Sequence, residues 1–281
     1  MQFILGGLTS GAIYALIALG FCVVHNTMGI VNFVQVDFVS LGGMLFYTCV
    51  VMYGLPIYVG VVGAIIGVAI IAALIELLAL RPSKSDHHLV LIFLTIGVSI
   101  IMRGIMKLIW GENRMAVPSL SGDDPIHVFG ATIMPQAIWI LALTSLAIIF
   151  LIALFRYTGI GLAMRGVAAN SRAALIIGLN TGRVKSASFA LAGALGGLAG
   201  ILVTPLTTLN YDVGVLLGLK GFAGAILGGF GSFGGAVIGG LALGLMESLT
   251  AGYFSSAYKD VVAFVMLLLV LFVRPKGIMG R

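Results

Sequence analysis

Charged residues are scarce in this chain of 281 residues: they make up 9% of it, against about 25% in soluble proteins. Hydrophobic residues make up 60%, and the mean hydropathy is +1.20. A globular fold this apolar has too little polar surface to cover its core, which excludes a soluble enzyme. The composition therefore predicts a polytopic membrane protein, built from spans of about 20 apolar residues each.

Residues that carry chemistry are also few. The two cysteines, Cys22 and Cys49, lie inside apolar runs, and the four histidines are scattered, so we predict neither a disulfide framework, a metal site nor a catalytic site. No Gly-Lys pair occurs in the chain, so the P-loop pattern is missing. We therefore expect no cofactor in this chain. If this membrane protein is a transporter that uses ATP, the ATP must bind to a partner subunit. The basic residues form no dense patch, so we expect no nucleic-acid partner.

Glycine, by contrast, is abundant, with 40 residues. It is costly in soluble helices but common where membrane helices pack closely. Pairs four residues apart, such as Gly224 and Gly228 or Gly240 and Gly244, fall on one helix face. Residues 229–234 match the dinucleotide fingerprint G-x-G-x-x-G, but they lie in a membrane segment, not between a strand and a helix. We interpret this motif as close packing or a broken helix.

Apolar runs separated by polar connections predict the topology. They cover residues 3–24, 33–52, 56–79, 89–110, 136–155, 186–204, 214–250 and 258–273. The run at 214–250 is too long for one ordinary helix and is interrupted near residues 228–235, so it either crosses twice or re-enters. We expect an all-α membrane helical bundle of eight or nine spans, forming one transmembrane domain over residues 1–281.

The distribution of lysine and arginine predicts the orientation. Ten of the fifteen fall in three segments that can share one side: Arg81, Lys84, Arg156, Arg165, Arg172, Arg183, Lys185, Arg274, Lys276 and Arg281. Because cytoplasmic loops carry an excess of these residues, we place the three segments and the C-terminus in the cytoplasm. Counting back through three spans puts the N-terminus on the other side.

Polar residues inside the apolar runs are candidates for a translocation pathway. Asn32, Gln35 and Asp37 fall together near the start of the second run. A charge in hydrocarbon is costly and normally faces the bundle interior or a water-filled path. One alternative is a structural role, in which these polar groups fix the packing of the helices. The other is a position at the membrane interface. Lys220 and Glu247 flank the glycine-rich interruption and are candidates for pairing across it.

The basic stretch at 158–182 is a candidate docking segment. As one helix, it would put Arg165 and Arg172 on the same face with Ala169 between them, and Gly178 would end it. Small residues on the surface of such a helix suit docking into a groove of another protein. The alternative is a basic amphipathic linker that lies on anionic lipid. The candidate docking residues are Arg165, Ala168, Ala169, Asn170, Arg172, Ala173, Ala174 and Gly178.

Two sets of residues resemble a known family. Residues 173–178, Ala-Ala-Leu-Ile-Ile-Gly, resemble the core of the E-A-A-x-x-x-G loop of ABC importer permeases, with Arg172 at the glutamate position. A closer resemblance, to LivH-type permeases of branched-chain (hydrophobic) amino-acid importers, runs in order along the chain. It is carried by residues 11–20, 31–37, 178–184, 228–232, 258–262 and 274–278. Gln35 and Val36 stand where this family usually has His-Gly.

The resemblance implies a permease subunit without its own ATPase site, not an enzyme, in a bacterial-type inner membrane. Its implied partners are two cytoplasmic ABC ATPases docked on 158–182, an extracytoplasmic substrate-binding protein, and a second permease that is either a related chain or another copy. The implied substrates are branched-chain or other hydrophobic amino acids, with urea or short amides as the alternative. From the residues alone, an ion-coupled transporter with Asp37, Glu76 and Glu247 as a relay also remains open. Because Glu76 lies close to Arg81, we expect its side chain to reach the membrane interface instead.

Overall fold

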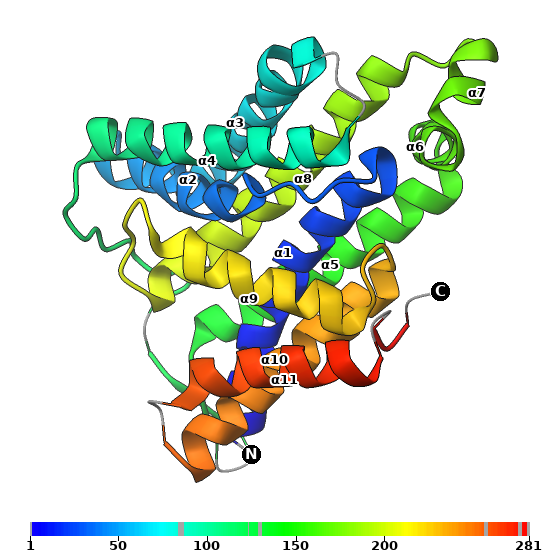
Figure 1. Cartoon of the computed structure of the whole chain (residues 1–281). Helices are drawn as coiled ribbons and strands as arrows, with labels where there is room; N and C mark the ends of the chain where they lie inside the picture. Colours follow the sequence, from blue (N-terminus) through cyan, green and yellow to red (C-terminus); the bar gives the residue numbers. More distant parts are fainter. Residues whose placement is uncertain are drawn as a thin grey trace.

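A computed structural model of the chain describes residues 2–83, 87–122, 124–128, 131–255, 258–274 and 277–279. Long helices dominate these residues (Figure 1). The α-helices are α1 (Gln2–Met28), α2 (Gln35–Tyr47), α3 (Ile57–Ile75), α4 (His88–Trp110), α5 (Pro135–Tyr157), α6 (Gly159–Ala169), α7 (Ser171–Ile176), α8 (Thr181–Val203), α9 (Val213–Gly228), α10 (Phe233–Tyr253) and α11 (Lys259–Val273). Shorter helical turns extend three of them: η1 (Thr48–Met52), η2 (Glu76–Leu80) with η3 (Arg81–Ser83), and η4 (Thr204–Leu206).

Seven helical segments are long and apolar enough to cross a membrane. They are Gln2–Met28, Gln35–Met52, Ile57–Ser83, His88–Trp110, Pro135–Tyr157, Thr181–Leu206 and Phe233–Tyr253. The 16-residue α9 and the 15-residue α11 are apolar but shorter. The seven long apolar segments in the described part of the chain confirm the expected helical membrane bundle.

Helix α1 lies at the centre of the bundle, and its residues from Gly11 to Val24 are buried. Glycines let α10 approach its backbone directly: a Cβ on Gly244 would lie 2.3 Å from the amide nitrogen of Gly11, and one on Gly240 would lie 2.6 Å from that of Ala15. The glycine-rich helices therefore pack by backbone contact around α1, as small-residue spacing in membrane helices predicts.

The predicted interruption of the glycine-rich run is confirmed as a tight turn between α9 and α10. Gly229 and Gly231 in this turn have φ values of 107° and 95°, which favour glycine. The two helices lie against each other (Figure 1), and a Cβ on Gly228 would lie 1.8 Å from the carbonyl oxygen of Gly235. The G-x-G-x-x-G motif is thus the turn of a helical hairpin.

Helix α2 begins inside the bundle. Gly29, with a φ of 70°, ends α1, and residues 29–34 lead back until Gln35 lies against Gly20 of α1. From there α2 runs alongside α8: Gly200 lies against Val39. Gln35 is therefore fully buried between α1 and α8. That it lines a pathway, fixes the packing or lies at the membrane interface stays a prediction.

The long polar connection between α4 and α5 contains a small hairpin that the all-α expectation did not include. Strands β1 (Ile126–Val128) and β2 (Ala131–Ile133) pair antiparallel. A further antiparallel bridge joins Met115 to Leu209, which ties this connection to the one before α9. Backbone groups outside helices need partners, and these pairings supply them. Three residues used to predict the orientation, Lys84, Lys276 and Arg281, lie outside the described residues.

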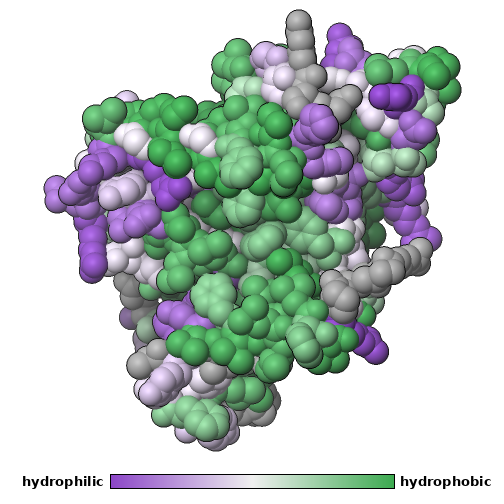
Figure 2. All heavy atoms as spheres, in the orientation of Figure 1, coloured by the Kyte–Doolittle hydropathy of each residue, from purple (hydrophilic) through white to green (hydrophobic). Residues whose placement is uncertain are grey.

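Apolar side chains cover much of the outer surface (Figure 2). Leu108 on α4 is 87% exposed and Phe272 on α11 is 92% exposed. In a water-soluble protein, such an extensive apolar surface would cause association. It is the surface that a lipid-embedded bundle requires.

Candidate translocation and coupling sites

Asn32 and Gln35 place buried amide groups at the start of α2. The Oδ1 atom of Asn32 accepts a hydrogen bond from the Val34 amide at 3.2 Å, and Nε2 of Gln35 donates one to the Ala192 carbonyl on α8 at 3.1 Å. Both side chains are fully buried. Nδ2 of Asn32 and Oε1 of Gln35 have no hydrogen-bond partner among the described residues. Buried groups in this state are rare and mark places where water or a ligand can bind.

Asp37 forms an ion pair that the sequence analysis did not predict. Its Oδ1 atom lies 3.3 Å from Nε of Arg103 on α4, and Nη2 of Arg103 donates to Oγ of Ser99 at 3.2 Å. Asp37 is buried and Arg103 is half-buried. Arg103 is a basic residue inside the fourth apolar run. The rule that singles out charged residues inside such runs therefore points to Arg103 as well as to the acids.

Lys220 is the centre of a second buried charge cluster. Its Nζ atom lies 2.7 Å from Oε1 of Glu247 on α10 and 2.6 Å from Oδ1 of Asp260 on α11. The hydroxyl of Tyr14 on α1 donates to Oε2 of Glu247 at 2.6 Å. The predicted pairing of Lys220 with Glu247 across the α9–α10 turn is therefore confirmed. Tyr14 and Asp260 are not among the predicted pathway residues.

The five pathway candidates form two groups, not one. A Cβ on Gly218 would lie 2.3 Å from Val36, so this face of α9 packs on the start of α2. Lys220 follows two residues later, about 200° around the helix, and faces α10 and α11. Helix α9 thus separates the Asn32–Asp37 group from the Lys220 cluster. That either group lines a pathway stays a prediction.

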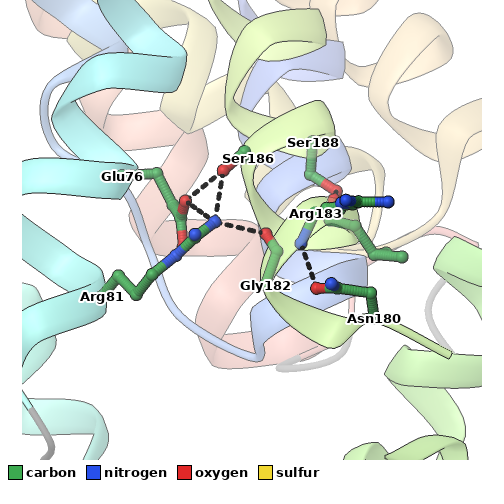
Figure 3. A network of polar contacts seen from close by, with 8 residues as sticks. Glu76, Arg81, Asn180, Gly182, Arg183, Ser186 and Ser188 are labelled. Carbon is green, nitrogen blue, oxygen red and sulfur yellow. Dashed lines mark hydrogen bonds and ion pairs between the residues drawn. The ribbon is translucent and has the colours of Figure 1, made fainter. Parts of the chain in front are cut away.

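Glu76 pairs with Arg81 and lines a cavity at the ends of the helices, and its position at the membrane interface stays a prediction. It is 1% exposed and faces α8, where Nη2 of Arg81 lies 3.0 Å from its Oε2 atom (Figure 3). The same Nη2 donates to the Gly182 carbonyl at 2.9 Å and to Oγ of Ser186 at 2.8 Å, and the Ser186 hydroxyl donates to Glu76. The Arg81 cation and the Ser186 hydroxyl compensate the charge of the buried Glu76 carboxylate. This network fixes the end of α3 to the start of α8.

The predicted single helix over the basic stretch is wrong, because the chain folds there into α6 and α7. Asn170 between them is extended, with a φ of −160°, and its Oδ1 atom accepts from the Ala173 amide at 3.0 Å. Asn170 therefore caps α7, as short polar side chains do at helix starts. Arg165 and Arg172 lie on different helices and share no helix face.

The end of α7 confirms the predicted stop at Gly178. Its φ is 86°, and the amides of Gly178 and Leu179 bond to the carbonyls of Leu175 and Ala174, the pattern of a Schellman cap. Seven of the eight docking candidates are at least partly accessible, and only Ala174 is buried. Beside them, Leu175, Ile176 and Ile177 are 56%, 86% and 76% exposed.

Comparison with known proteins identifies the family. A family model described as branched-chain amino acid transport system / permease component matches residues 3–271. The chain belongs to this family. The permease is 36% identical to the high-affinity branched-chain amino acid transport system permease protein LivH of Escherichia coli K12, over all of this chain and 96% of that one. It is 32% identical to the corresponding permease protein BraD of Pseudomonas aeruginosa, with the same coverage.

A solved structure shares the fold of the permease. PsaBC from Streptococcus pneumoniae, in complex with Fab, aligns with a TM-score of 0.53 over 98% of this chain and 93% of that chain. The identity of 14% limits the likeness to the fold. The resemblance drawn from the ordered segments along the sequence is therefore confirmed at the level of family and fold.

Proposed function

We propose that this permease moves branched-chain or other hydrophobic amino acids across a bacterial cytoplasmic membrane as a subunit of an ATP-driven importer. The match to the permease family over residues 3–271 carries this proposal. Two cytoplasmic ABC ATPases hydrolyse the ATP, and an extracytoplasmic binding protein delivers the substrate. A second permease, either a related chain or another copy, completes the membrane unit.

The ATPases dock on the coupling segment, which is residues 158–182. Three consecutive apolar side chains, residues 175–177, are exposed there in a stretch rich in basic residues. Exposed apolar groups outside a membrane mark protein contacts. The cytoplasmic location is supported by five basic residues in and beside the segment: Arg156, Arg165, Arg172, Arg183 and Lys185. The basic residues Arg274, Lys276 and Arg281 support a cytoplasmic C-terminus in the same way.

Both ends of the coupling segment are firmly connected to membrane helices. Gly161 lies against the end of α5, where a Cβ would be 2.3 Å from the Leu154 carbonyl oxygen, so α5 and α6 meet in a rigid corner. At the other end, Asn180 caps α8 by accepting from the Arg183 amide at 3.0 Å. Displacement of α6 and α7 by an ATPase would therefore move α5 and α8. Alternating access follows if these helices rearrange around the buried amides of Asn32 and Gln35.

The contacts of the three membrane acids favour this function over an ion-coupled relay. Asp37 lies beside Arg103, Glu76 beside Arg81 and Glu247 beside Lys220, each pair in a different part of the bundle. A relay needs acids that exchange protons along one path. Acids that each lie against a cation are suited instead to holding helices together.

Uptake by the reconstituted importer tests the proposal. We expect leucine uptake into vesicles that contain both permeases, the ATPases and the binding protein, and no uptake when a non-hydrolysable ATP analogue replaces ATP. Uptake that persists without hydrolysis, or that needs only an ion gradient, would contradict it. A thermal-shift screen of the binding protein against amino acids, urea and short amides then decides between the two substrate classes.

A further inference from the structure

A cavity of about 980 Å³ lies where the coupling segment meets the rest of the bundle. Its walls come from the end of α1, the η2–η3 corner, the start of α4, the α6–α7 connection and the start of α8. Three cations line it from three elements: Arg81 on η3, Arg172 on α7 and Lys185 on α8. We call it the coupling cavity.

The positive charge of the coupling cavity is not compensated by its own walls. Among the described residues, one acid, Glu76, lines it against three cations, an excess of two positive charges. Glu76 already pairs with Arg81. Among the described residues, no ion pair connects Arg172 or Lys185 to an acid. Two histidines, His25 and His88, also line the cavity.

The location and size of the coupling cavity indicate the kind of anion that would fit. It lies at the ends of four membrane helices, and Met28, Leu80 and Leu91 give it an apolar side. Basic pockets between helices at the cytoplasmic boundary suit phospholipid headgroups. Its volume is at the upper end of the range of small-molecule pockets, about 300–1,000 Å³, so one amino acid would fill only part of it.

We propose that the coupling cavity binds a phosphate-bearing anion, held by Arg172 and Lys185 and presented by the headgroup of an anionic phospholipid. A soluble phosphate shares this chemistry, and the experiment below separates the two sources. Because Arg172 belongs to the coupling segment and Lys185 to α8, the bound anion would bridge the two. Control of coupling by lipid in this way rests on the proposed function, whereas the binding itself does not.

Lipid retention by the purified transporter tests the proposal. Assembled transporter is extracted from vesicles of phosphatidylcholine with a minor fraction of phosphatidylglycerol, and the lipid that stays bound is measured by native mass spectrometry. The cavity variant is Arg172→Gln/Lys185→Gln. The control variant, Arg156→Gln/Arg183→Gln, removes the same charge from basic residues that do not line the cavity.

We expect wild type and control to retain phosphatidylglycerol and the cavity variant to lose it by roughly 30-fold, from the usual contribution of a basic residue near anionic lipid. Equal retention by all three proteins would overturn the proposal. So would retention of the lipid by the permease alone but not by the assembled transporter, because the cavity would then belong to the ATPase interface.

A soluble arm identifies the source of the phosphate. In vesicles of phosphatidylcholine alone, inorganic phosphate or glycerol phosphate is added, and the unfolding midpoint is measured. No change for wild type supports the lipid headgroup, whereas stabilisation of wild type but not of the cavity variant supports a soluble phosphate at the same residues. ATP-driven uptake in the vesicles that contain phosphatidylglycerol tests the proposed function separately, so failure of one leaves the other measurable.

Discussion

Gly20 in α1 leaves space for the side-chain amide of Gln35: a Cβ on residue 20 would lie 2.1 Å from Nε2 of Gln35. On the other side of that amide, a Cβ on Gly196 of α8 would lie 3.0 Å from the same nitrogen. The buried amide at the start of α2 is therefore held between two glycine surfaces. The close approach of α1, α2 and α8 depends on these small residues and on the hydrogen bond to Ala192.

Replacing Gly20 is expected to destabilise the permease. Gly20→Ala forces Gln35 out of its position in a closely packed interior, and such overpacking costs about 1–3 kcal/mol. The unfolding midpoint, measured in detergent by intrinsic fluorescence, should fall. Gly97→Ala on α4 is the matched control, because nothing lies within 4 Å of its Cβ position and alanine favours the helix. Its midpoint should stay the same or rise.

A second substitution tests whether Gln35 is the cause. Gly20→Ala/Gln35→Ala removes the clash, so the midpoint should recover part of the loss. The recovery should be incomplete, because the hydrogen bond to Ala192 is lost. A double variant as unstable as the sum of the single variants would show that the two residues are not coupled.

Lys220 is expected to be essential for stability. Lys220→Met leaves Glu247 buried beside Asp260 without a cation, and breaking a buried ion pair in this way costs about 3–5 kcal/mol. Folded protein should be lost during extraction, as measured by size-exclusion chromatography. Lys107→Met is the control, because Lys107 pairs with Glu112 on the surface, where such pairs contribute little. If both variants extract equally well, the Lys220 cluster does not hold the helices together.

The sequence predicted the spans because apolar length and loop charge are local properties. It also predicted the Lys220–Glu247 pair, since both residues flank one interruption. Tyr14, by contrast, meets Glu247 across 233 positions of the sequence, and no periodicity reports such a contact. Arg103 is a single basic residue among apolar neighbours, and its spacing in the sequence does not indicate that it pairs with Asp37.

Local capping explains why the predicted helix over residues 158–182 was wrong. The spacing of Arg165 and Arg172 indicated one helix face, but an asparagine favours a helix start over a helix interior. Asn170 bonds to the Ala173 amide and begins a new helix. Gly178 ends α7 as predicted, because its φ of 86° is a conformation that few other residues adopt.

Asp37→Asn distinguishes a pathway role from a structural one. The substitution keeps the size of the side chain but removes the charge that faces Arg103, which can still reach water because it is half-buried. If Asp37 lines the pathway, uptake per folded transporter should fall at least tenfold while the unfolding midpoint changes little. If it only joins α2 to α4, the midpoint should fall and uptake per folded molecule should stay unchanged. Arg103→Gln should follow the same pattern as Asp37→Asn in either case.

Ile176→Asp should separate the permease from its ATPases. The side chain is 86% exposed on α7, so the folded permease should tolerate a charge there, whereas an apolar docking contact should not. A buried interface contact of this kind contributes more than about 1 kcal/mol, which corresponds to at least a roughly fivefold weaker association. Co-purification of the ATPases measures the loss. Ile126→Asp, an exposed apolar residue of the hairpin between α4 and α5, is the matched control and should bind them normally. Equal recovery of ATPases with both variants would mean that the exposed end of α7 is not their docking surface.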